Sequence, residues 1–131
     1  MPNLVMIVDD HAVIRQMVRA LLEAESLVVS DAADGAEGVQ KAQAEEPDLI
    51  IVDLSMPVMN GLEAARKLKV LLPHVPLLMF TNSSGGIMEQ EARAAGISAV
   101  VSKSGSDNAK QLLAQTKTLL GLDQAGAPRA S

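Results

Sequence analysis

The 131-residue chain contains no cysteine, tryptophan or tyrosine, and Phe80 is its only phenylalanine. A chain without cysteine has no disulfide bonds, no thiolate nucleophile and no cysteine-bound zinc, and it suits a reducing compartment. The formal net charge is −5, whereas a nucleic-acid surface presents a basic patch or aromatic rings on which bases stack. We therefore expect a cytoplasmic protein that does not bind nucleic acid directly.

The sequence also lacks a long hydrophobic run. Leu4 to Val8 is too short for the apolar region of a signal peptide and is followed at once by two aspartates, and no other segment approaches the length that spans a membrane. The hydrophobic fraction of 48% is nevertheless enough for one buried core. We predict one domain at residues 1–121, no membrane contact, and a short flexible tail at residues 122–131.

Five short apolar runs have the length of β-strands. They are rich in Val, Ile and Leu, and most do not alternate apolar with polar residues. Such runs are typical of parallel strands that helices cover on both faces. The predicted strands are Leu4 to Val8, Leu27 to Val29, Leu49 to Val52, Leu77 to Phe80 and Ala99 to Val101.

A segment with helical character follows each run. After the first strand, apolar residues recur at helical spacing from Ile14 to Leu22, with charged residues between them. Proline ends the second and third helical segments. The fourth segment has few large apolar residues and is expected to be the most mobile helix. Ser106 and Asp107 are predicted to cap the last helix. These four helices are predicted at about residues 36–46, 61–72, 87–95 and 108–120.

Strands and helices thus alternate five times. In one domain of this length, the pattern predicts an α/β fold of the (βα)₅ type, with a doubly wound, flavodoxin-like parallel sheet of five strands and right-handed crossovers. The commonest strand order for such a sheet is 2-1-3-4-5, and we predict that order here. Ligands bind beyond the carboxyl ends of the strands where the strand order reverses, which is between the first and third strands.

Polar side chains follow the strands at that edge. Asp9 and Asp10 come after the first strand, Asp53 after the third, and Thr81 and Lys103 follow the fourth and fifth. Three converging carboxylates repel one another at pH 7 unless a proton or a cation lies among them. Oxygen ligands favour Mg²⁺, and an ammonium and a hydroxyl group can bind a phosphate. We interpret this as a site for phosphoryl transfer to a carboxylate.

Each of these residues also has an ordinary structural explanation. An aspartate after a strand often caps a helix or lies in a turn, and a single threonine or lysine at a strand end needs no function. A chance origin is improbable for four strand ends that together supply acids, a hydroxyl and an ammonium group, so we interpret the set as functional. His11 follows the acid pair, so a metal role is conceivable, but we expect a surface residue at a helix start, because Mg²⁺ disfavours imidazole. We expect His74 to be a solvated loop residue.

The polar residues resemble the receiver domain of two-component response regulators, the CheY-like family. The resemblance extends over about residues 4–120 and covers four strands. It rests on Val8-Asp9-Asp10, on the segment from Asp53 to Gly61, on Thr81 and on Lys103.

This resemblance implies a role for each site residue. Asp53 is implied as the acceptor of a phosphoryl group that Thr81 and Lys103 bind. The implied phosphodonor is a histidine kinase or a histidine phosphotransfer protein, and the phosphorylated form, a monomer or a phosphorylation-dependent dimer, changes its binding to a downstream protein. The domain would catalyse only its own phosphorylation and dephosphorylation. The implied ligands of Mg²⁺ are Asp10, Asp53, the main-chain carbonyl of Ser55 and, mostly through water, Asp9.

The chain departs from the family pattern on its fifth strand. Val100 stands where the family usually has an aromatic residue, and Ser104 replaces the usual proline after the lysine. In the loop after the third strand, Asn60 replaces the commoner aspartate and remains a polar turn former. Because Val100 is stiff and buries little area, we predict that the output depends mainly on the segment from Thr81 to Gly86 and on the fourth helix.

Three alternatives stay open at this point. A phosphohydrolase with an aspartyl-phosphate intermediate would need an acid two residues after its nucleophile, where this chain has Ser55. A flavodoxin-like mononucleotide binder is disfavoured, because Asp9 and Asp10 would repel its phosphate. The third alternative is that the chain is the receiver fragment of a longer regulator.

Overall fold

The computed structural model describes residues 3–82 and 86–122. Within these ranges strands and helices alternate along the chain, as the apolar runs and the helical periodicity predict. The elements are β1 (Leu4–Val8), α1 (Ala12–Glu23), β2 (Val28–Ala32), α2 (Gly35–Glu45), β3 (Leu49–Val52), α3 (Gly61–Leu71), β4 (Leu77–Thr81), α4 (Gly86–Ala94), β5 (Ala99–Ser102) and α5 (Asn108–Leu120).

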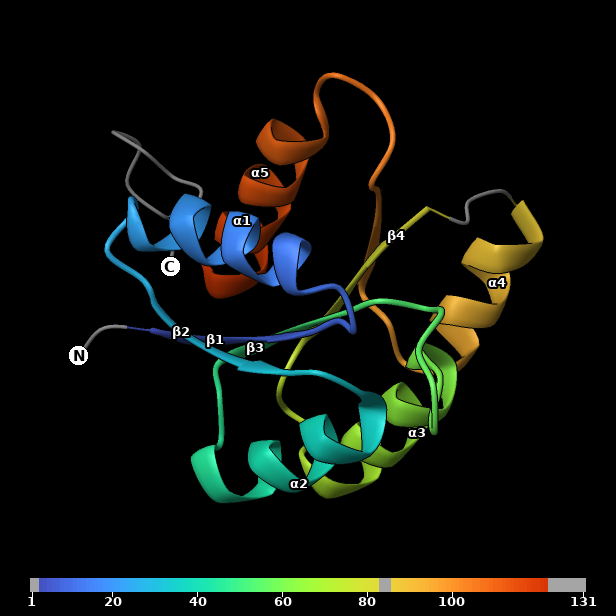
Figure 1. Ribbon diagram of the computed structural model, residues 1–131. Helices are drawn as coiled ribbons and strands as arrows, with labels where there is room; N and C mark the ends of the chain where they lie inside the picture. The colour runs from blue at the N-terminus through green and yellow to red at the C-terminus, as the bar shows by residue number, and fades with distance from the viewer. Residues whose placement is uncertain (1–2, 83–85, 123–131) are drawn as a thin grey trace.

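The strands form one parallel sheet in the order β2-β1-β3-β4-β5. The predicted (βα)₅ fold and its strand order are therefore confirmed. Helices α1 and α5 lie on one side of the sheet, and α2 and α3 lie on the other (Figure 1). From β1 the chain passes to β2 on one side and later to β3 on the other, so the strand order reverses between β1 and β3.

The core consists of two apolar layers, one on each face of the sheet. Successive residues of β1 belong to different layers: Ile7 packs in the cluster that contains Leu22 of α1, whereas Met6 packs in the cluster that contains Leu68 of α3. All four residues of β3 are buried. Burial on both faces explains why the strand sequences are continuously apolar.

The second strand is longer than its apolar run predicts. It continues through Ser30 and Asp31 to Ala32, because an edge strand can present polar residues to solvent and to neighbouring side chains. Asp31 lies opposite two arginines of α1, with its Oδ2 3.6 Å from Nε of Arg15 and 3.6 Å from Nη2 of Arg19. A search for apolar runs misses such residues.

The predicted cap of the last helix is confirmed in its position at Asp107, but no capping bond forms. Asp107 is the N-cap residue of α5, but its side chain forms no capping hydrogen bond, since its backbone (φ −99°, ψ 8°) is not in the extended conformation that capping requires. Nδ2 of the neighbouring Asn108 donates instead to the main-chain carbonyl of Lys103 at 2.7 Å. This bond attaches the start of α5 to the end of β5.

Two predicted features lie outside the described residues: Ser83 to Gly85 within the predicted output segment, and residues 123–131 of the predicted tail. None of the helices formed by the described residues combines the length and apolar character that crossing a bilayer requires.

Candidate functional site

Two aspartates meet where the central strands end. Asp9 follows β1 and Asp53 follows β3, and these strands pair in parallel up to Val8 and Val52. The main-chain NH of Asp53 donates to the carbonyl of Val8 at 3.0 Å, which continues the pairing by one residue. Both carboxylates are buried, with only 1% of the side chain of Asp9 and 4% of that of Asp53 exposed. The sheet register therefore places two buried acidic groups side by side.

Lys103 reaches these aspartates from the far side of β4. Its Nζ lies 2.6 Å from Oδ2 of Asp9 and 3.4 Å from Oδ2 of Asp53, and 6% of its side chain is exposed. The same Nζ is 5.8 Å from the ring centroid of Phe80 on β4, so the ammonium group also lies over the ring of a core residue. The ammonium group partly compensates the charge of the two buried carboxylates.

Burial dominates the electrostatics of Asp53. Removal from water disfavours the charged carboxylate and raises the pKa of Asp53, and the neighbouring charge of Asp9 raises it further. Lys103 lowers the same pKa through its charge and its hydrogen bond, as does a backbone hydrogen bond of Leu54, without cancelling the effect of burial. Because burial disfavours the ionised form of Asp53, a further cation next to the carboxylate would stabilise that ionised form.

Asp10 adds a third and more accessible carboxylate, with 32% of its side chain exposed. One ligand atom each from Asp9, Asp10, His11 and Asp53 lie within 4.8 Å of one another. Asp10 and Ser55 line the same groove of about 610 Å³ beside the loop after β3, so solvent reaches the acidic cluster at Asp10. Hard oxygen donors around an open position fit a hydrated divalent cation such as Mg²⁺, which retains part of its water shell.

Thr81 completes the predicted set. It is the last residue of β4, is 1% exposed, and pairs with Ser102 in the sheet register. Its main-chain carbonyl accepts a hydrogen bond from the NH of Lys103 at 2.8 Å. Thr81 and Lys103 are thereby positioned together, although they come from different strands.

Gly61 fits against the backbone of Asp53, where only a residue without a Cβ atom can approach so closely. A Cβ atom at Gly61 would lie 2.2 Å from the carbonyl oxygen of Asp53, and the NH of Gly61 donates to the carbonyl of Leu54 at 2.8 Å. The start of α3 is also capped reciprocally by Asn60 and Glu63, so Asn60 keeps a capping function. The helix thereby holds the loop that follows the aspartate.

Sequence reasoning did not find Arg15, and it set aside a role for His11 in the site. Nη1 of Arg15 donates to the main-chain carbonyl of Asp9 at 2.6 Å, and the only signal was a charged position off the apolar stripe of the helix. His11 is exposed at the start of α1, as predicted, but its Nδ1 contacts both Asp9 and Asp10. Local sequence gives no indication of where an exposed ring points.

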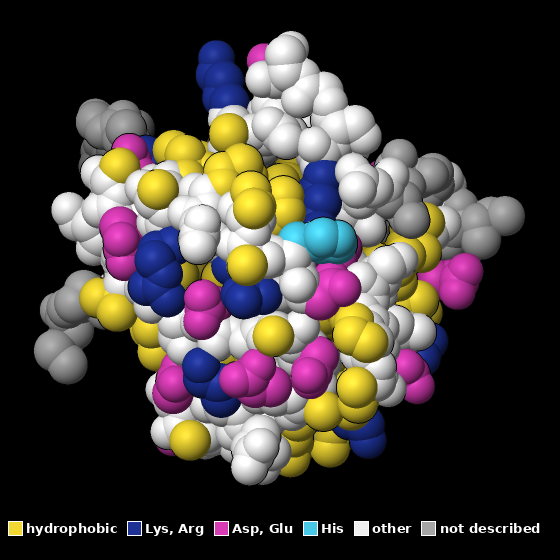
Figure 2. All heavy atoms as spheres, viewed as in Figure 1, with side chains coloured by type: hydrophobic (Ala, Val, Ile, Leu, Met, Phe, Trp, Pro, Cys, Tyr) yellow, Lys and Arg dark blue, Asp and Glu magenta, His cyan; other side chains and the backbone are white. Residues whose placement is uncertain are grey.

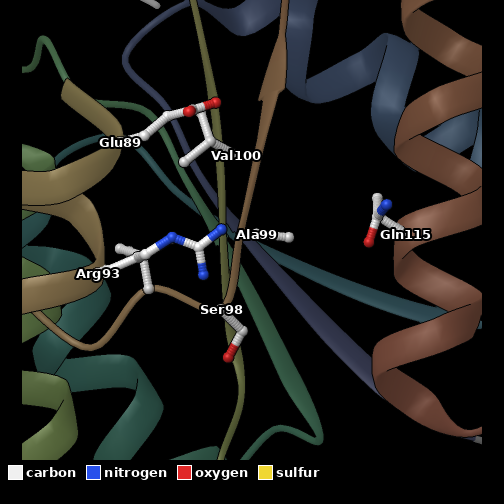
Figure 3. Close-up of a pocket in the computed structure, with 7 residues that line it drawn as sticks. Glu89, Arg93, Ser98, Ala99, Val100 and Gln115 are labelled. Carbon is white, nitrogen blue, oxygen red and sulfur yellow. The ribbon is translucent and has the colours of Figure 1, made fainter. Parts of the chain in front are cut away.

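A separate hollow of about 240 Å³ lies beside Val100, between α4, β5 and α5. Figure 3 shows Glu89 and Arg93 reaching from α4 toward β5, with Gln115 on the opposite side from α5. None of the acidic site residues lines this hollow. The half-buried side chain of Val100 therefore belongs to a different surface from the site.

The fold and its polar edge define a class, the doubly wound α/β domains with an acidic site where the strand order reverses. The family model described as the response regulator receiver domain matches residues 5–116, and the chain belongs to this family. Receiver domains are phosphorylation-dependent switches of two-component signalling, and this chain is a switch of that kind.

Similar proteins support the same assignment. The chain is 37% identical over 117 residues to a protein of Pseudomonas aeruginosa described as a candidate transcriptional regulator, covering 88% of this chain and 56% of that protein. The chemotaxis protein CheY4 of Vibrio cholerae has a similar structure, with a TM-score of 0.84, 34% identity, and coverage of 91% of this chain and 99% of that one.

A CheY-like receiver domain protein of Methanospirillum hungatei is similar with a TM-score of 0.86, 28% identity, and coverage of 97% of this chain and 100% of that one. The likeness thus covers complete receiver domains. In contrast, this chain spans about half of the Pseudomonas protein and 30% of a protein-glutamate methylesterase/protein-glutamine glutaminase of a Nocardioides species.

Proposed function

We propose that Asp53 is the phosphoacceptor of this receiver domain, which comprises residues 1–121. One observation supports the assignment above all: Asp53 is a buried carboxylate whose Oδ2 lies 3.4 Å from Nζ of Lys103, and it lies within reach of both Asp9 and Asp10. A carboxylate oxygen of Asp53 attacks the phosphorus atom of a phosphohistidine. The bond between phosphorus and the imidazole nitrogen breaks, the nitrogen keeps the electron pair, and Asp53 becomes an acyl phosphate.

The ligands of the divalent cation are Asp9, Asp10, Asp53 and the main-chain carbonyl of Ser55, and the cation is Mg²⁺. When bound, Mg²⁺ neutralises negative charge on the carboxylates and on the phosphoryl oxygens. The donor set supports this choice, because carboxylate and carbonyl oxygens are the ligands that Mg²⁺ prefers.

Lys103 and Thr81 bind the phosphoryl group. The ammonium group of Lys103 is already desolvated beside Asp9 and Asp53, so it can contact a phosphoryl oxygen on Asp53 with a small movement of its flexible side chain. The hydroxyl of Thr81, at the end of the neighbouring strand, donates to a second oxygen. Movement of Thr81 toward the phosphate links the site to the segment that leads into α4.

The proposed partners follow from membership of the receiver family. The donor is a histidine kinase or a histidine phosphotransfer protein in the cytoplasm, and the phosphorylated domain, a monomer or a phosphorylation-dependent dimer, alters its binding to a downstream protein. The domain catalyses only its own phosphorylation and dephosphorylation. A phosphohydrolase is the weaker candidate, because position 55 is a serine and cannot protonate a leaving group as a carboxylic acid would.

Intact-mass spectrometry tests the assignment. Incubation with a small phosphodonor and Mg²⁺ is expected to add one phosphoryl group to the parent protein and none to Asp53→Asn. The matched control is Asp48→Asn, which changes an aspartate before β3, outside the site. A phosphoryl adduct that persists in Asp53→Asn, or that forms equally well in chelator, contradicts the proposal.

A further inference from the structure

One ring nitrogen of His11 faces two acidic side chains of the site. Nδ1 lies 3.1 Å from Oδ1 of Asp9 and 3.1 Å from Oδ1 of Asp10. The side chain is 62% exposed, so neighbouring residues do not enclose the ring. Figure 2 shows one histidine side chain on this face of the molecule, next to acidic side chains and near a basic one.

These distances match those between ligands of one cation. Two ligand atoms at right angles around an octahedral ion, each about 2.1 Å from it, lie about 3.0 Å apart. Nδ1 of His11 stands at that separation from an oxygen of Asp9 and from an oxygen of Asp10. The other oxygen of Asp9 is bound by Lys103 at 2.6 Å, so an ion beside His11 would share Oδ1 of Asp9 with the main-chain NH of His11, which donates to that oxygen at 2.8 Å.

We propose that His11 is a nitrogen ligand of the divalent-cation site. The inference rests on the proposed function, because it uses the same acidic pocket. Its consequence concerns selectivity: a pocket of carboxylates alone suits Mg²⁺, whereas added imidazole favours transition-metal ions such as Mn²⁺, Co²⁺ and Ni²⁺. This receiver site thus binds transition-metal ions more tightly than an otherwise identical site without the histidine.

A hydrogen bond from a protonated Nδ1 to Asp9 would give the same distance without any metal. The two explanations differ in what removal of the ring does. If His11 only donates a hydrogen bond, its loss affects Mg²⁺ and Ni²⁺ binding alike. If it is a ligand, its loss lowers the affinity for Ni²⁺ and leaves the affinity for Mg²⁺ unchanged.

Isothermal titration of the untagged full chain with NiCl₂ and with MgCl₂ separates these outcomes. His11→Gln keeps a polar side chain, and its affinity for Ni²⁺ is expected to fall at least about tenfold. Loss of a residue that only supports a metal ligand already lowers metal affinity by about this factor, so loss of a direct ligand should lower it at least as much. His74→Gln is the matched control, since His74 is the other of the two histidines in the chain and is also exposed. An unchanged ratio of Ni²⁺ to Mg²⁺ affinity in His11→Gln overturns the inference.

Pulsed electron paramagnetic resonance of the Mn²⁺-loaded protein supplies a second readout that does not depend on affinity. Modulation from a directly coordinated imidazole nitrogen is expected in the parent protein and in His74→Gln, and is expected to be lost in His11→Gln. Absence of nitrogen modulation in the parent protein, with Mn²⁺ bound, overturns the inference.

Failure of this inference is distinguishable from failure of the proposed function. Asp10→Ala and Asp53→Asn are expected to weaken binding of both Mg²⁺ and Ni²⁺. If these variants bind Mg²⁺ as the parent does, the acidic pocket is not the cation site and both proposals fail. If they lose Mg²⁺ while His11→Gln binds Ni²⁺ as the parent does, only the role of His11 is wrong.

Discussion

Lys103 and Asp9 stand 94 positions apart in the sequence, and their side chains form a buried ion pair with Nζ 2.6 Å from Oδ2. Asp53 shares the same ammonium group at 3.4 Å. One cation from the fifth strand therefore compensates the charge of both central strand ends. Lys103 consequently contributes both to the stability of the folded protein and to the charge balance of the site.

Removal of that ammonium group is expected to destabilise the protein strongly. Lys103→Met keeps the aliphatic stem but leaves two buried carboxylates unpaired, which costs about 3–5 kcal/mol of unfolding free energy. Chemical denaturation at pH 7 in chelator measures the loss, and added Mg²⁺ is expected to restore part of it. Lys110→Met, at an exposed position of α5, is the control. Equal stability of the two variants contradicts the ion pair described here.

The raised pKa of Asp53 predicts a specific pH dependence in the absence of divalent cations. Because the folded-state pKa lies above the unfolded value near 3.8, ionisation of Asp53 costs stability, and this cost grows as pH rises from that value through the raised folded pKa. Asp53→Asn is therefore expected to be more stable than the parent at pH 7. The difference should vanish as pH falls and the parent aspartate takes up its proton.

Urea denaturation of both proteins over a pH series in chelator measures this difference. Asp107→Asn, at an exposed aspartate without a capping bond, is expected to show no such trend. If the parent is more stable than Asp53→Asn at neutral pH, the difference in unfolding free energy has the opposite sign. That result is incompatible with a desolvated carboxylate at position 53.

Divalent cations are expected to stabilise the unphosphorylated protein. An ion that binds the folded acidic pocket and not the unfolded chain adds about 2.7 kcal/mol at a hundredfold excess over Kd. Asp10→Ala is expected to remove most of this gain, whereas Asp107→Ala retains it. Thermal unfolding with and without millimolar Mg²⁺ provides the measurement. If the melting temperature of the parent does not change with Mg²⁺, these residues do not form a cation site.

Gly61→Ala is expected to disturb the site through the backbone. The added Cβ would lie 2.2 Å from the carbonyl oxygen of Asp53, so the loop must move, at a cost of about 1–3 kcal/mol. The displacement should also slow phosphorylation of Asp53 by a small phosphodonor. Gly86→Ala, where a Cβ meets no atom within 4 Å, is the matched control. It is expected neither to lower stability through a clash nor to slow phosphorylation of Asp53.

The output signal is expected to leave the site through the start of α4 and not through Val100. Val100 is too small to expose or bury much area when its rotamer changes. Hydrogen exchange with and without a phosphoryl mimic should therefore change mainly at residues 82–95. Changes confined to β5 (Ala99–Ser102) would show instead that the strand transmits the signal.

The local sequence contains most of the information on the fold. The helix boundaries of α2, α3, α4 and α5 agree with the helical periodicity to within one residue, and the apolar runs mark all five strands, because burial on both faces demands continuous apolar residues. The length of β2 was missed. Ser30 and Asp31 lie on an edge strand, where ion pairs with α1 replace apolar burial.

The composition of the site was also readable from sequence, whereas its contacts were not. Aspartates directly after the first and third apolar runs, and a lysine after the fifth, must come to one edge of a parallel sheet. Only the sheet register and the side-chain rotamers decide that Lys103 pairs with Asp9 more closely than with Asp53, and that Nδ1 of His11 points to the acidic pair and not to solvent. Local patterns determine which residues lie at an edge, but distances between distant side chains depend on the packing of the whole chain.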